Sequence, residues 1–71
     1  MNRRASSKKE EALETLIEAL LTRYGQGKAI SVLNIGKAFT HVRIGFMADP
    51  TPDGLDNAAR EAVAMFYEVS P

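Results

Sequence analysis

The segment from Lys28 to Met47 constrains the fold of this chain more than any other part of the sequence. It is the only run rich in β-branched residues, it contains no acidic residue, and it holds the single histidine, His41. β-branched side chains favour strands because they pack well on a pleated surface. The sequence therefore predicts β-structure at the centre of the chain, with the flanking segments packed against it.

Two strands are predicted within this segment, Ala29 to Ile35 and Phe39 to Met47, joined by a turn at Gly36-Lys37. The second strand alternates along its length. One of its faces is predicted to carry Phe39, His41 and Arg43, and the other Val42, Ile44 and Phe46.

The turn leaves the register of this hairpin open. A two-residue type II′ turn that starts at Gly36 places Ile30 and Val32 on the outer face, whereas a three-residue loop places Leu33 and Phe39 there. A shift of one residue moves every side chain to the opposite face of the sheet. Either register therefore leaves at least two large apolar side chains on the outer face.

Amphipathic helices are predicted on both sides of the hairpin. Apolar residues recur at helical spacing over residues 8–24, after a capping box that begins at Ser7 and before a glycine stop at Gly25. The second helix is predicted to follow Thr51 as its N-cap, with Pro52 at the first helical position. Both helices are expected to cover the same face of the hairpin.

The predicted fold class is α+β, in the order helix–strand–strand–helix, with an antiparallel β-hairpin and both helices on one of its faces. Residues 1–7 are predicted to form a flexible basic arm, and residues 8–71 a single domain. Two strands make a weak sheet, and each would keep an unpaired edge. A homodimer that joins two hairpins is therefore expected to complete the fold.

No pattern of residues in the sequence predicts catalysis, a cofactor or a metal site. The chain has no cysteine, and a lone His41 has no acidic residue beside it in the hairpin to orient it as a base. The Gly25-Gln26-Gly27-Lys28 run follows a helix and lacks the spacing of a phosphate loop. We therefore expect a protein that is not an enzyme and has no small-molecule substrate.

The formal net charge is zero, but the charges are unevenly placed. The N-terminal arm and the centre are basic, whereas the two flanking segments are acidic. We predict a partner-binding surface on the outer hairpin face and a second candidate surface on the acidic face of the first helix. The first comprises Phe39, His41, Arg43, Lys28, Lys37, Ile30 and Val32, and the second Glu10, Glu14 and Glu18.

These features predict a small interaction or regulatory protein that binds another protein and self-associates through the hairpin. The alternative is a nucleic-acid-binding module, in which an aromatic side chain and cations on a sheet face stack a base and hold phosphates. That module would use Arg3, Arg4, Lys8, Lys9 and Arg43 together with Phe39 and His41. No apolar run approaches the length of a membrane span, so we expect a cytoplasmic protein without a membrane partner.

Overall fold

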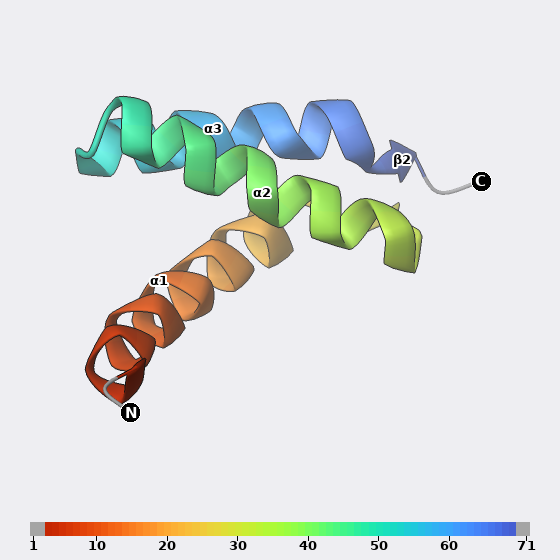
Figure 1. The fold of residues 1–71 in the computed structure, drawn as a ribbon. Coiled ribbons are helices and arrows are strands. Elements are labelled where there is room, and N and C mark those ends of the chain that lie inside the picture. Colours follow the sequence, from red (N-terminus) through yellow and green to blue (C-terminus); the bar gives the residue numbers. More distant parts are fainter. Residues whose placement is uncertain (1–2, 70–71) are drawn as a thin grey trace.

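The computed structural model describes the backbone of residues 3–69 and the side chains of residues 8–69. This part of the chain contains three helices and a small antiparallel strand pair (Figure 1). In chain order the elements are α1 (Arg3–Tyr24), β1 (Lys28–Ala29), α2 (Val32–Ala48), α3 (Pro52–Phe66) and β2 (Glu68–Val69).

Helix α1 ends at Tyr24, as predicted, but begins at Arg3. The predicted start at Lys8 is wrong, and Ser7 lies inside the helix rather than at its cap. No glycine or proline interrupts residues 3–24, and arginine, lysine and alanine are good helix formers. The mobility predicted for residues 1–7 stays a prediction, and residues 1 and 2 lie outside the described part of the chain.

The predicted hairpin is wrong, because residues 32–48 form the single helix α2. Ser31 caps this helix, since its side-chain oxygen accepts a hydrogen bond from the backbone N–H of Asn34. Gly36, predicted to be a turn, lies within the second turn of the helix. The preference of β-branched residues for strands is weak, and packing against the other helices overrides it here.

The strand pair joins distant parts of the chain. β1 and β2 are antiparallel, with Lys28 opposite Val69 and Ala29 opposite Glu68. The pair connects the segment that enters α2 to the segment that leaves α3, and so it holds the two helices together at one end.

Helix α3 begins as the sequence predicts. Thr51 is its N-cap and accepts a hydrogen bond from the backbone N–H of Gly54, and Pro52 is its first residue. The helix runs to Phe66, and the backbone becomes extended at Tyr67.

Helices α2 and α3 lie side by side as an antiparallel pair, and α1 runs away from them at a steep angle (Figure 1). Gly45 of α2 lies directly against Ala58 of α3, so the two backbones approach closely. The core formed by residues 8–69 is small, and four of its nine buried hydrophobic residues are alanines. These nine residues are Ile17, Leu21, Ala38, Val42, Leu55, Ala58, Ala59, Ala62 and Val63.

None of the three helices in residues 3–69 combines the length and the apolar character that a membrane span requires.

Candidate interaction surface

The side of α2 that faces away from the core carries large apolar side chains. Leu33 is 73% exposed, Ile44 is 61% exposed and Met47 is 77% exposed. A helix advances by about 100° per residue, so positions spaced alternately four and three residues apart share one face. We call the face with this spacing the outer α2 stripe, which consists of Leu33, Lys37, Thr40, Ile44 and Met47.

A shallow groove runs along this stripe on the side of α3. Its volume is about 570 Å³, and it is open to solvent. A side chain at Gly36 would meet no other atom within 4 Å, so this glycine leaves open space in the wall of the groove. The groove is lined by Leu33, Gly36, Lys37, Thr40, His41, Ile44 and, from α3, Phe66.

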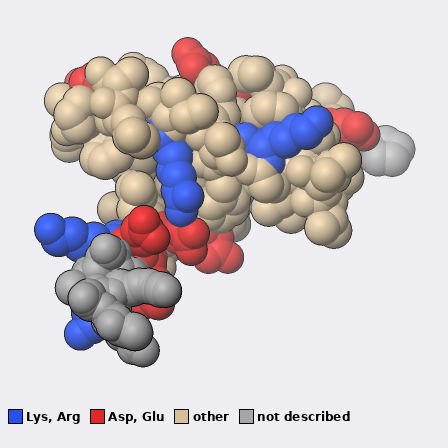
Figure 2. Space-filling model, viewed as in Figure 1, with Lys and Arg blue, Asp and Glu red and all other residues tan. Residues whose placement is uncertain are grey.

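The charged residues of α2 are few, and none is acidic. Arg43 donates a hydrogen bond to Glu14 of α1 at 2.8 Å, and His41 lies 3.1 Å from a carboxylate oxygen of Glu61 on α3. Lys37 makes no ion pair within residues 8–69. Figure 2 shows wide uncharged areas over the α2–α3 pair and acidic side chains gathered on α1. The outer α2 stripe therefore carries a single cation among apolar side chains.

The structure does not bring Phe39, His41 and Arg43 onto one face. Positions 39 and 41 are separated by about 200° around a helix, whereas positions 39 and 43 are separated by about 40°. Phe39 packs against the core, beside the acidic side of α1. The ring of His41 lies edge-on to Phe66, with 6.3 Å between the ring centroids. The predicted sheet face is thus replaced by two different sides of a helix.

The other predicted partner-binding residues are also dispersed. Ile30 is half-buried against the core, whereas Val32 is 86% exposed at the start of α2. Lys28 is exposed in β1, and Lys37 belongs to the outer α2 stripe. Whether these residues bind a partner stays a prediction.

The acidic face of α1 lies partly against α2. Glu14 and Glu18 line a hollow of about 530 Å³ that also contains Phe39, while Glu10 is exposed. Of the basic residues in the nucleic-acid alternative, Lys8 and Lys9 are exposed near the beginning of α1. The side chains of Arg3 and Arg4 lie outside the described residues. Arg43, the remaining cation of that alternative, is paired with Glu14.

Leu33, Thr40, Ile44 and Met47 were missed by the sequence interpretation as members of one surface. Their spacing with Lys37, alternately four and three residues, is the signal that could have found them. This spacing was overlooked because the segment was interpreted as two strands. In a strand, side chains on one face recur every two residues instead of at the helical spacing.

A second apolar groove lies between α1 and the turn that joins α2 to α3, with a volume of about 520 Å³. Its two polar wall residues are already engaged, because Thr51 caps α3 and both carboxylate oxygens of Asp56 accept hydrogen bonds. The walls are formed by Leu16, Ala19, Leu20, Phe46, Pro50, Thr51, Pro52, Leu55 and Asp56.

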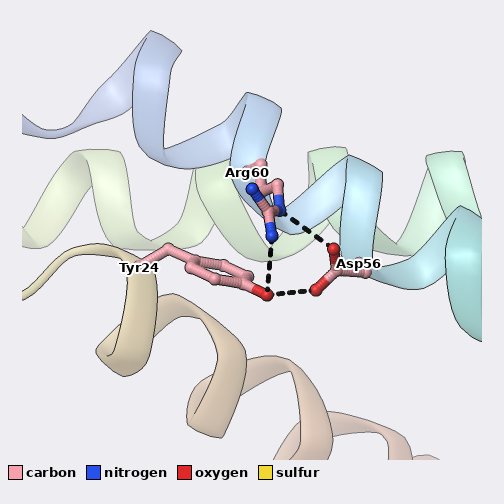
Figure 3. Close-up of polar contacts among 3 residues, drawn as sticks. All are labelled: Tyr24, Asp56 and Arg60. Carbon is pink, nitrogen blue, oxygen red and sulfur yellow. Dashed lines mark hydrogen bonds and ion pairs between the residues drawn. The ribbon is translucent and has the colours of Figure 1, made fainter.

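Beside this groove, Tyr24, Asp56 and Arg60 form a polar cluster (Figure 3). The Tyr24 hydroxyl donates a hydrogen bond to Asp56 Oδ1, and Arg60 Nε donates to Asp56 Oδ2 at 2.9 Å. The Arg60 guanidinium lies 4.6 Å from the centre of the Tyr24 ring. The hydrogen bond from Tyr24, followed by the interaction with Arg60, lowers the pKa of Asp56, and the hydrogen bond to Asp56 raises the pKa of Arg60. Each polar group of the cluster is thus used to fasten α1 to α3.

Within the described residues, no three histidine, cysteine, aspartate or glutamate side chains gather where they could hold a metal ion. The expectation that the protein is not an enzyme stays a prediction. No protein-family model, curated protein or solved structure matches this chain.

Proposed function

We propose that this protein is a small, non-catalytic interaction protein that works by binding a helical protein segment on its outer α2 stripe. The observation that carries the proposal is the exposure of Leu33, Ile44 and Met47 on one face of a well-capped helix. Burial of apolar surface contributes roughly 25 cal/mol per Å², and contiguous exposed apolar patches mark interaction sites.

The form of the stripe favours a helix as the bound element. An amphipathic helix lays its apolar side chains into a groove at spacings of three and four residues, which is the spacing of the stripe itself. The groove beside the stripe is long and shallow, and Gly36 leaves room in it for a side chain of the partner. A compact small molecule would instead call for an enclosed pocket.

The charges support a protein partner over nucleic acid. The outer α2 stripe contains one cation and no aromatic ring, whereas nucleic-acid surfaces combine several cations with stacking side chains. The cation that the alternative needs from α2, Arg43, is paired with Glu14 on the acidic side of α1. A cytoplasmic location remains part of the proposal, since a chain without cysteine fits a reducing compartment.

Site-specific photo-crosslinking tests the proposal. A benzophenone amino acid at Ile44 of the tagged protein is irradiated in lysate of the source cells, with and without nuclease. We expect a protein adduct, formed by another protein or by a second copy of this chain, that survives nuclease treatment. The matched control carries the same probe at Leu16, which is 53% exposed but lies on α1. Equal protein adducts from both positions, no protein adduct at all, or an adduct that nuclease abolishes would contradict the proposal.

A further inference from the structure

The layout of the outer α2 stripe points to one particular partner. Its apolar side chains gather at the two ends, with Leu33 near the beginning of α2 and Ile44 and Met47 near its end. Between them lie the small or polar positions Gly36, Lys37 and Thr40. A surface with two apolar ends and a polar middle is complementary to a second copy of itself that runs in the antiparallel direction.

We infer that the outer α2 stripe binds the same stripe of a second copy, so that two α2 helices pack antiparallel across a two-fold axis. The inference rests on the proposed function and names its partner. The axis passes near the middle of the stripe, between Lys37 and Thr40. The Leu33 end of one copy then lies against the Ile44 end of the other, so Leu33 and Ile44 of both copies are covered.

Charge selects the antiparallel arrangement over the parallel one. In a parallel pair each residue lies beside its own copy, so the two Lys37 ammonium groups would face each other in one layer of the interface. In the antiparallel pair each Lys37 lies beside the Thr40 region of the other copy, and its flexible stem lets the ammonium group reach water. An isologous, self-complementary contact of this kind is the commonest interface in homo-oligomers.

The remainder of the molecule is compatible with a second copy. The formal net charge is zero, so two copies do not repel each other at long range. Within residues 8–69 the core has nine buried hydrophobic residues, and Ile17 and Val42 are the largest that are fully buried. Small domains with a limited core commonly gain stability from oligomerisation. Association through α2 would add apolar burial on the side of the molecule that the core leaves uncovered.

Sedimentation of the purified protein tests association. We expect a monomer–dimer equilibrium at micromolar concentration. Ile44→Lys is expected to raise the dissociation constant by about 100-fold, because each dimer loses two apolar contacts and gains a charged side chain against the Leu33 end of each copy. Position 44 is 61% exposed in the monomer, so the variant keeps its fold, which far-UV circular dichroism verifies. The control Leu16→Lys, also at an exposed leucine, is expected to leave the equilibrium unchanged.

Disulfide cross-linking tests the orientation, because the chain contains no cysteine. Two singly substituted proteins, Leu33→Cys and Ile44→Cys, are oxidised separately and then as a mixture. A disulfide needs the two Cα atoms within about 7 Å, so the antiparallel dimer gives the mixed product and little of either homodimeric product. Homodimeric products from each variant alone would establish a parallel pair and overturn the inference.

The outcomes separate this inference from the proposed function. A purified protein that stays monomeric while its Ile44 probe captures a different protein overturns the homodimer and leaves the proposed function standing. A monomer whose probe captures no protein overturns both.

Discussion

The hydroxyl of Tyr24, in the last turn of α1, donates a hydrogen bond to the carboxylate of Asp56 in the second turn of α3. The second oxygen of that carboxylate accepts a hydrogen bond from Arg60, whose guanidinium also lies over the Tyr24 ring. One tyrosine is thus fixed through both its hydroxyl and its ring. The contact sets where α1 leaves the α2–α3 pair, and so it shapes the apolar groove beside α1.

Removal of the Tyr24 hydroxyl should weaken this attachment. In Tyr24→Phe the ring remains under Arg60, but Asp56 loses a hydrogen-bond donor. We expect the free energy of unfolding to fall by about 1 kcal/mol, measured by urea denaturation. The control is Tyr67→Phe, because the ring of Tyr67 packs against Gly25 and its hydroxyl makes no hydrogen bond within residues 8–69. Equal losses in the two variants would contradict the role of the Tyr24 hydroxyl.

The same cluster predicts a dependence of stability on pH. The hydrogen bond from Tyr24, and then those with Arg60, hold the pKa of Asp56 below its usual value of 3.8. The folded carboxylate therefore binds a proton less readily than the unfolded one, so its contribution is present above that value and is lost as the pH falls through the folded pKa. We expect Asp56→Asn to be less stable than the wild type at about pH 6, and the difference in unfolding free energy to shrink below pH 3.8. A difference that stays constant over this range would contradict the assignment.

Some of the helix boundaries could be predicted from the sequence alone. The end of α1 at Tyr24 and the start of α3 at Thr51 and Pro52 were predictable, because each is marked by residues whose chemistry stops or caps a helix. The start of α2 has a comparable cap in Ser31, which was not recognised because the β-branched residues around it indicated strands.

The hairpin error also determined which site residues were missed. In a strand, His41 shares a face with Phe39, whereas in the helix Phe39 turns toward α1 and His41 toward Glu61 on α3. Once α2 is known to be a helix, the outer stripe follows from spacing alone. The contact between Tyr24 and Asp56 joins residues 32 positions apart, and no local pattern predicts which distant side chains meet.

The N-cap of α3 is expected to stabilise the protein through one oxygen atom, that of the Thr51 hydroxyl group. Thr51→Ala removes the acceptor of the hydrogen bond from the backbone N–H of Gly54. We expect the free energy of unfolding to fall by about 1 kcal/mol, measured by urea denaturation. Thr51→Ser keeps the hydroxyl and should retain most of the stability. A serine variant as unstable as the alanine variant would show that the methyl group, and not the cap, matters at this position.

Two glycines of the same helix should respond in opposite directions to an added methyl group. At Gly45 the new Cβ would lie 2.6 Å from the Cβ of Ala58, so α2 and α3 would have to move apart. We expect Gly45→Ala to lower the free energy of unfolding by about 1–3 kcal/mol despite the better helix propensity of alanine. At Gly36 the same methyl group meets nothing within 4 Å.

Gly36→Ala is therefore the matched control, and it should raise the free energy of unfolding by about 0.5–1 kcal/mol, because alanine restricts the unfolded chain and favours the helix. Both variants are made in the Ile44→Lys background, so that self-association does not contribute to the measured stability. Urea denaturation provides the comparison. Stabilisation by both alanines would mean that α2 and α3 do not meet closely at Gly45, and destabilisation by both would mean that Gly36 is not in open space.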